Sequence, residues 1–315
     1  VEADWAALPF RISPEKVRLG RWLFYDARLS ADGAISCATC HVPAHGFSEE
    51  APVSTGIRGQ KGTRKSPPIL NAGWPVSPVF FWDGRAASLA EQAKGPIANP
   101  VEMGHTLEGA TAAIAAIPGY RPYFREAFGD DAVTIDRIAE AIAAYEATRL
   151  SGNSRWDRFR AGDETALGEL ERHGEALFNG VAGCNACHLG PNLTDGQFHN
   201  IGIGYEFPGF GRLPELGFAD QGRFAVTGDE RDMGAFKTPT LRDVSKRAPY
   251  MHDGSVPDLE EAVLHYWRGG IPNPWQSDKL VRFPLSRHDL DALVAFLRAL
   301  DGEGYLDAPP KTFPR

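Results

Sequence analysis

The sequence predicts an all-α chain that is built as two tandem domains of similar construction, connected through long loops. The first observation is a repeated pentapeptide, CATCH at 37–41 and CNACH at 184–188. The second is that similar apolar stretches flank both pentapeptides in the same order, as in a tandem repeat. The third is the content of 34 Gly and 24 Pro in 315 residues, which predicts long loops and little strand.

Amphipathic stretches mark the repeated unit. One stretch precedes each pentapeptide, at 19–24 and 173–178, and another closes each half, at 141–145 and 292–296. Between the second pentapeptide and the last helices, residues 190–235 are expected to form a long ordered loop with a short strand pair. The expected helices are 14–24, 107–116, 134–149, 165–179, 257–268 and 286–300.

A polar segment around Gly162 precedes a helix start and predicts the domain boundary. We therefore expect an N-terminal domain at 1–162 and a C-terminal domain at 163–315. Ser13 is expected to cap the first helix, with Pro14 at its first helical position.

Both pentapeptides have the Cys-x-x-Cys-His pattern of a covalent haem c attachment site. The adjoining histidines, His41 and His188, would be the proximal iron ligands. Two haem c groups predict that each domain is a cytochrome c-like unit of three or more helices around its haem. The attachment residues would be all four cysteines of the chain: Cys37, Cys40, Cys184 and Cys187.

Two other interpretations of these motifs are weaker. A single structural zinc site would use two Cys-x-x-Cys pairs, but these pairs begin 147 residues apart (184 minus 37), and such a site needs no adjoining histidine. A thioredoxin-like dithiol expects a strand before its first cysteine, and none is predicted at either place.

Composition and charge limit the cellular compartments in which the protein is expected and the classes of partner that it is expected to bind. The net charge is −8 without a basic block, so neither nucleic acid nor anionic lipid is an expected partner. No apolar run approaches the roughly 18 residues of a membrane helix, so we expect no membrane span. The first residues, 1–5, lack a signal pattern and are interpreted as the start of a mature chain after its signal peptide was removed. Because haem c is attached outside the cytoplasm, we expect a periplasmic protein.

Further blocks lie between and after the pentapeptides. They are Phe81-Trp82-Asp83-Gly84-Arg85, then Gln92, Pro96 and Glu102, then Lys237-Thr238-Pro239-Thr240-Leu241-Arg242, and Ala248-Pro249-Tyr250-Met251-His252-Asp253-Gly254. Together with both pentapeptides, they make the chain resemble the bacterial di-haem cytochrome c peroxidase and MauG superfamily along nearly its whole length.

The resemblance places three residues over the first haem. Glu102 would be the acid/base for peroxide cleavage, Gln92 would orient peroxide or water, and Pro96 would shape the same wall. Without the resemblance, a solvated loop carboxylate would be the preferred interpretation of Glu102.

A histidine that blocks the first iron in many peroxidases of this superfamily is absent here. It belongs to a Gly-His-Gly-x-Gln-Lys-Gly-like loop, which corresponds to 56–62 in this chain, and Ile57 stands at its position. Isoleucine cannot ligate iron, so we expect the first iron to be open to peroxide. His45 follows the motif too closely to reach across the ring and is expected to contact the surface or a propionate.

The second iron is expected to have a tyrosine ligand. The peroxidase branch uses a methionine fourteen residues after the histidine of the Pro-Tyr-x-His-x-Gly block. Counting from His252 leads to Tyr266, and MauG-type members use tyrosine there. A hard, anionic phenolate favours high oxidation states of iron. In the alternative interpretation, Tyr266 is an ordinary core aromatic and Met251 is the ligand.

The resemblance also implies a relay residue and a calcium ion. Trp82 corresponds to the tryptophan between the haems, where an indole can be oxidised transiently; it is also expected to be buried. One Ca²⁺ between the haems would be held by the Asn71 side chain and by the main-chain carbonyls of Arg247 and Pro249, since hard oxygen ligands suit this ion.

These features predict a MauG-like oxidoreductase that reacts with hydrogen peroxide. The hypothesis is that both irons share the oxidising equivalents in a high-valent, bis-Fe(IV)-type state. This state would oxidise a tryptophan of a separate partner protein, to kynurenine as in the MbnH branch or to a quinone. Ala182 replaces the tryptophan from which the quinone-forming member passes holes to methylamine dehydrogenase, which disfavours that partner. Alternative exits are Trp156, Trp267 and Trp275.

Two other functions stay open at this point. The first is a cytochrome c peroxidase that removes hydrogen peroxide with electrons from a small cytochrome, against which Ile57 and Tyr266 argue. The second is an electron carrier without enzymatic activity, which requires two six-coordinate irons.

Overall fold

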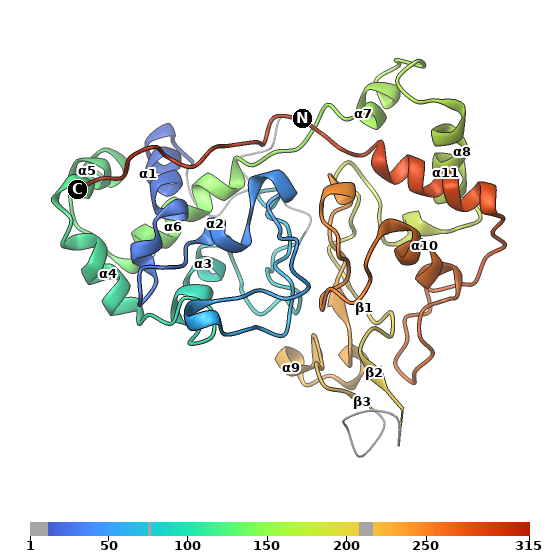
Figure 1. The fold of residues 1–315 in the computed structure, drawn as a ribbon, viewed down its shortest axis with the longest axis horizontal. Helices are drawn as coiled ribbons and strands as arrows, with labels where there is room; N and C mark the ends of the chain where they lie inside the picture. The colour runs from blue at the N-terminus through green and yellow to red at the C-terminus, as the bar shows by residue number, and fades with distance from the viewer. Residues whose placement is uncertain (1–11, 75–76, 208–216) are drawn as a thin grey trace. The chain divides into compact units, whose positions relative to one another are not determined.

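The computed structural model describes residues 12–74, 77–207 and 217–315. Within them the chain is mostly helical with little strand, as predicted. It folds into two compact units: unit 1 takes residues from 1–78, 86–150 and 304–315, and unit 2 takes 79–85 and 151–303 (Figure 1). The N-terminal residues that we interpreted as the start of a mature chain lie outside the described residues.

Unit 1 is a helical unit around the first pentapeptide. Ser13 caps its first helix by accepting a hydrogen bond from the Lys16 amide, with Pro14 at the first position, as predicted. Its helices are α1 (Pro14–Tyr25), α2 (Cys37–Cys40), α3 (Leu89–Ala98), α4 (Leu107–Ala115), α5 (Arg121–Phe128) and α6 (Ile135–Ala147). The core lies between α1, α5 and α6 and is rich in aromatic side chains such as Phe24 and Tyr145.

Helices α1 and α6 approach each other unusually closely. A Cβ atom placed on Gly20 of α1 would lie 1.8 Å from the carbonyl oxygen of Ala141 and 3.0 Å from the Cβ of Tyr145. Only glycine therefore permits this crossing, because any side chain would collide with the backbone of α6.

Unit 2 repeats this crossing with different residues. A Cβ on Gly174 of α8 would lie 2.0 Å from the carbonyl oxygen of Ala292 and 2.8 Å from the Cβ of Phe296 on α11. The helices of unit 2 are α7 (Arg155–Arg160), α8 (Glu169–Asn179), α9 (Phe224–Thr227), α10 (Leu259–Trp267) and α11 (Arg287–Arg298). Since each glycine lies on the helix that precedes its pentapeptide, the shared crossing is consistent with the predicted tandem repeat.

The strands are short and all belong to the loop region of unit 2. Strand β1 (Phe198–His199) pairs antiparallel with β4 (Phe236–Lys237), and β2 (Tyr205–Glu206) pairs antiparallel with β3 (Gly217–Phe218). The described part of the expected 190–235 loop thus contains slightly more strand than the single pair we expected.

Each unit contains segments that lie on the other side of the predicted boundary near Gly162. The C-terminal tail returns to unit 1, where Tyr305 is buried in the core and Asp307 accepts hydrogen bonds from Arg21 and Tyr145. Residues 151–162 belong to unit 2. The observed division therefore differs from the predicted domains at 1–162 and 163–315. Contacts between residues far apart in the sequence place these segments in their units, and the polarity of the local sequence does not reveal such contacts.

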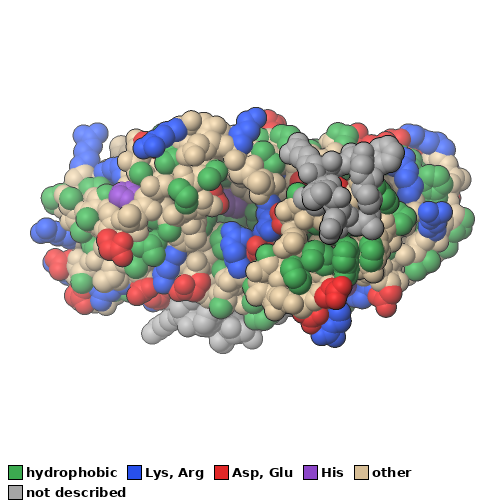
Figure 2. Space-filling view, turned by 90° about the horizontal axis from the view of Figure 1, so that it is seen from below, with side chains coloured by type: hydrophobic (Ala, Val, Ile, Leu, Met, Phe, Trp, Pro, Cys, Tyr) green, Lys and Arg blue, Asp and Glu red, His purple; other side chains and the backbone are tan. Residues whose placement is uncertain are grey.

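No helix in the described ranges is long and apolar enough to cross a membrane. On the face shown in Figure 2, acidic and basic side chains are interspersed among neutral ones. On that face in Figure 2, neither acidic nor basic side chains gather in a single area.

Candidate functional site

The first pentapeptide forms the one-turn helix α2, with His41 directly after it. The His41 amide bonds to the carbonyl oxygen of Cys37 at 2.9 Å. The ring Nδ1 lies 3.0 Å from the carbonyl oxygen of Phe47, and burial lowers the pKa of the imidazole. A neutral ring that donates from Nδ1 leaves Nε2 for a metal, which is how a proximal histidine is oriented.

The second pentapeptide has the same geometry. It forms a 3-10 turn, Cys184–Ala186, and the His188 amide bonds to the carbonyl oxygen of Cys184 at 2.9 Å. The ring Nδ1 lies 3.0 Å from the carbonyl oxygen of Leu193, and burial lowers the pKa of His188 to about 4. All four cysteines are free thiols, so the residues present in both units fit covalent haem c.

Glu102 lies on the same side of unit 1 as the first pair of thiols. Its charge contributes to the raised pKa values of Cys37 and Cys40, which are caused mainly by burial. The side chain of Asn99 donates a hydrogen bond to Oε1 of Glu102 at 2.7 Å. Glu102 is therefore held in a turn near the thiols rather than extending as a solvated loop carboxylate.

Ile57 lies directly beside Glu102. Its amide donates a hydrogen bond to the carbonyl oxygen of Glu102 at 2.8 Å, and its side chain is 3% exposed. A Cβ on Gly104 would lie 2.1 Å from Cδ1 of Ile57, so the isoleucine fills the space against this turn. His45, by contrast, lies near the surface, 3.4 Å from the carboxylate of Glu50.

Gln92 and Pro96 both lie on α3, four residues apart, which places them on one helix face. The carbonyl oxygen of Pro96 accepts a hydrogen bond from the amide of Met103 at 3.1 Å. This bond connects the end of α3 to the turn that carries Glu102, so the structure brings the three residues into one region of unit 1.

Tyr266 lies on α10 of unit 2, close to the thiols of the second pentapeptide. Burial raises the pKa of its hydroxyl, and the nearby Cys187 and Cys184 raise it further. Tyr266 is half-buried, and its hydroxyl has no hydrogen-bond partner among the described residues. An unpartnered phenol near these thiols fits an iron ligand. Met251 lies on a neighbouring turn with φ of 73° and is still the alternative.

Trp82 belongs to unit 2, although in the sequence it lies between the first two segments of unit 1. Its carbonyl oxygen accepts a hydrogen bond from the amide of Lys237 at 2.8 Å. Arg223 donates to the carbonyl oxygens of Asp83 and Gly84 at 2.9 and 3.0 Å. The relay candidate is thus attached to the unit that contains Tyr266.

The residues predicted to bind calcium belong to different units. Asn71 is buried in unit 1, and Arg247 and Pro249 belong to unit 2, so the calcium assignment stays a prediction. Among the described residues, Cys187, Asp195 and His199 form a group with metal-binding character. Because Cys187 is needed for haem attachment and His199 bonds to Asp195 at 2.9 Å, we assign no separate metal site there.

Sequence reasoning did not identify Glu146 on α6. Its side chain is buried, its Oε2 atom has no hydrogen-bond partner, and burial raises its pKa to about 8. The apolar run 141–145, which directly precedes it, was interpreted only as part of the closing helix of the repeat. A single acidic residue beside such a run does not by itself indicate a functional site.

Residues 14–165 match the model of the family described as di-haem cytochrome c peroxidase. The chain is 41% identical to the methylamine utilization protein MauG of Methylorubrum extorquens over 293 residues, which are 93% of this chain and 80% of that protein. It is 38% identical to the cytochrome c551 peroxidase of Nitrosomonas europaea over 295 residues, covering 93% and 82%.

A solved structure described as a MauG-like protein associated with microbial copper homeostasis is also similar. It superposes with a TM-score of 0.86 at 33% identity and covers 98% of this chain and 97% of its own.

Proposed function

Because the chain belongs to the di-haem cytochrome c peroxidase and MauG family of oxidoreductases, we propose that it uses hydrogen peroxide to oxidise a tryptophan of a separate protein. When bound, two haem c groups supply the redox chemistry: peroxide is activated at the first, and an oxidising equivalent is stored at the second. A periplasmic location accords with this chemistry.

The observation that carries the proposal is the pair of Ile57 and Glu102. A buried isoleucine stands where a histidine would close the first iron, and the acid/base candidate lies beside it. The first site is therefore ready for peroxide without a preceding ligand exchange.

The residues of unit 1 would handle the proton of the peroxide. Glu102, oriented by Asn99, would accept a proton from one oxygen of the peroxide and return it to the other, which leaves as water. Gln92 donates a hydrogen bond that orients the peroxide, and Pro96 keeps that wall of the site apolar. Cleavage then releases water.

The residues of unit 2 would hold the oxidising equivalent. His188 and Tyr266 are its proposed ligands, and a phenolate stabilises high oxidation states of iron. Trp82 is the proposed relay. Asn71, Arg247 and Pro249 are the proposed calcium ligands, which supply the hard oxygens this ion prefers.

Two observations support the proposed class of protein substrate: the similarity to known relatives and the presence of alanine at position 182. The similarity to a MauG-like protein associated with copper homeostasis supports a copper-linked partner. Ala182 offers no aromatic exit before the second pentapeptide, which argues against methylamine dehydrogenase. We therefore propose conversion of a partner tryptophan to an oxygenated product such as kynurenine.

The test is to incubate candidate partners, encoded nearby, with the enzyme and hydrogen peroxide, and to identify modified tryptophan peptides by mass spectrometry. Modification that requires both enzyme and peroxide is expected. If no partner is modified and peroxide is reduced rapidly and continuously with electrons from a small reduced cytochrome, the enzyme is a cytochrome c peroxidase.

That second function is favoured by the 38% identity to a cytochrome c551 peroxidase. A plain electron carrier is a third function, and it requires two six-coordinate irons. A high-spin ferric signal in the resting protein would exclude it.

A further inference from the structure

The loop after the second pentapeptide determines the surroundings of His188. The ring Nδ1 donates to the carbonyl oxygen of Leu193 at 3.0 Å. Leu193 has a φ of 51°, a left-handed conformation that costs a non-glycine residue roughly 1–2 kcal/mol. Other interactions must therefore hold this loop, and the buried Leu193 side chain in the core of unit 2 is one of them.

Residues 238–242 bind this loop along its length. The hydroxyl of Thr194 donates to the carbonyl oxygen of Thr238 at 2.7 Å. The hydroxyl of Thr240 donates to the carbonyl oxygen of Asn192 at 2.6 Å and lies 3.1 Å from its side-chain oxygen. These buried bonds fix the residues on both sides of Leu193.

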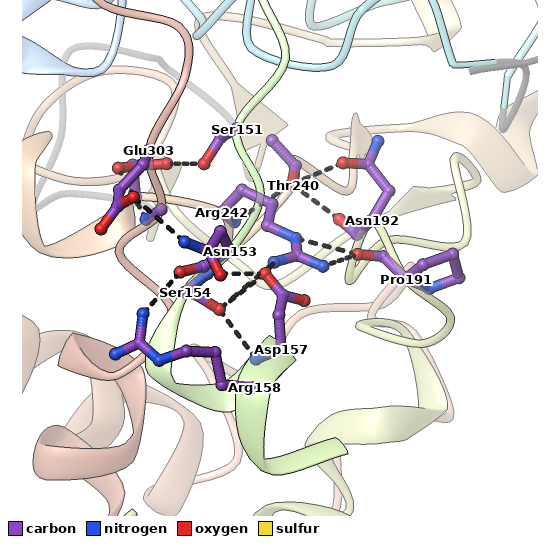
Figure 3. Close-up of polar contacts among 12 residues, drawn as sticks. Ser151, Asn153, Ser154, Asp157, Arg158, Pro191, Asn192, Thr240, Arg242 and Glu303 are labelled. Atoms are coloured by element: carbon purple, nitrogen blue, oxygen red, sulfur yellow. Dashed lines mark hydrogen bonds and ion pairs between the residues drawn. The ribbon is translucent and has the colours of Figure 1, made fainter. Parts of the chain in front are cut away.

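Arg242 adds a charged contact to the same loop, as Figure 3 shows. Its guanidinium is 2% exposed and donates from Nε to the carbonyl oxygen of Pro191 at 2.9 Å, with a second bond from Nη2. The opposite nitrogen, Nη1, pairs with the carboxylate of Asp157 on α7. Burial alone would raise the pKa of Asp157, but the bond and charge of Arg242 hold it below its usual value. The buried cation is thus fully paired.

We propose that residues 238–242 position the carbonyl oxygen of Leu193 against Nδ1 of His188 and thereby set the reduction potential of the second haem. This inference rests on His188 as an iron ligand, which is part of the proposed function. A hydrogen bond at Nδ1 makes the imidazole a stronger donor and favours the ferric state. Thr240 and Arg242 are therefore positioning residues, not catalytic ones.

Unit 1 holds the equivalent bond by other means. The carbonyl oxygen of Phe47, whose φ is 54°, accepts from Nδ1 of His41 at 3.0 Å. Next to it, Ser48 donates to the carbonyl oxygen of Ser66 at 2.6 Å, and the charged residues Glu49 and Lys65 bond to the Ser66 amide and the Ala51 carbonyl oxygen. Substitutions at 238–242 leave these contacts in place, so the first haem is an internal control.

The experiment is a spectroelectrochemical titration of both haems in the complete di-haem protein. Thr240→Val removes the hydroxyl with little change in shape, and Thr240→Ser keeps it. We expect Thr240→Val and Arg242→Lys to raise the potential of the second haem, with Thr240→Ser close to wild type and the first haem unchanged in all.

A potential of the second haem that is unchanged in Thr240→Val and Arg242→Lys would overturn the proposal, even where thermal stability falls. Failure of the proposed function would look different. The wild-type protein would then show no His-ligated second haem, or it would show both potentials without modifying a partner.

Discussion

The amide nitrogen of Ile57 donates a hydrogen bond to the carbonyl oxygen of Glu102 over 2.8 Å. The loop position at which many peroxidases carry an iron-ligating histidine is therefore hydrogen-bonded to Glu102, the residue that we propose as acid/base. Under the proposed function, the identity of residue 57 would decide whether peroxide reaches the first iron directly or must first displace a ligand.

Ile57→His should close the first site. If an imidazole at this position ligates the iron, as the resemblance to peroxidases with a histidine there implies, a low-spin ferric signal should replace the high-spin one. The reaction of the resting protein with peroxide should slow by at least about tenfold, because a ligand must first leave. Electron paramagnetic resonance and stopped-flow spectroscopy check this. Ile57→Val is the control, with a stability cost of about 0.5–1.5 kcal/mol and an unchanged spin state.

Tyr266→Phe should change the second haem and leave the first intact. Loss of the phenolate removes the anionic ligand, so we expect an altered absorption spectrum and a higher potential of the second haem. Tyr250→Phe is the matched control in unit 2. It loses a bond to the carbonyl oxygen of Val244, worth about 1 kcal/mol, but should keep the haem spectra. An unchanged second haem in Tyr266→Phe would make Met251 the preferred ligand.

Trp267 is the exit that the structure favours among the tryptophans considered. It directly follows Tyr266 on α10 and is 36% exposed, whereas Trp156 donates to Glu175 and packs under Arg242. We expect Trp267→Phe to slow partner oxidation several-fold while peroxide consumption in the first turnover is unchanged.

The control for this prediction is Trp22→Phe in unit 1, where the indole packs against Tyr123 and Phe313. Single-turnover oxidation of the partner, followed by mass spectrometry, is the measurement. If Trp275→Phe slowed this reaction and Trp267→Phe did not, the exit would lie at Trp275.

Gly20→Ala and Gly174→Ala should destabilise their own units. In each case the new methyl group would lie within 2.0 Å of a helix carbonyl oxygen, on Ala141 or Ala292, so the helices must separate. Overpacking of this kind costs about 1–3 kcal/mol, partly offset by the better helix propensity of alanine. Thermal unfolding measures the loss. Gly62→Ala is the control, because its methyl group would lie at an ordinary contact distance of 3.6 Å from the nearest atom, the carbonyl oxygen of Ser54.

The sequence predicted the features whose determinants are local. A pentapeptide contains its own cysteines and histidine, so both attachment sites follow from the local sequence as predictions, and the predicted cap by Ser13 is confirmed. The domain boundary could not, because Tyr305 and Asp307 are assigned to unit 1 by contacts that span the whole chain. Likewise, the run 237–242 was identified only through the family resemblance. Its bonds to the loop after His188 join residues about fifty positions apart, and the sequence alone does not reveal such contacts.

Glu146→Gln should remove a pH dependence of stability. Burial raises the pKa of Glu146 in the folded protein from 4.5 to about 8. The folded state thus favours the protonated acid, and its stability falls as the pH rises from about 4.5 and levels off above about 8. The variant cannot ionise, so its stability should rise relative to wild type across this window.

Thermal unfolding of both proteins between pH 5 and pH 9 provides the measurement. Glu140→Gln on the same helix, where the carboxylate pairs with Lys16 near the surface, is the control for loss of a negative charge. A constant difference in melting temperature between wild type and Glu146→Gln at every pH would mean that Glu146 finds a cationic or hydrogen-bonding partner once the first haem is attached.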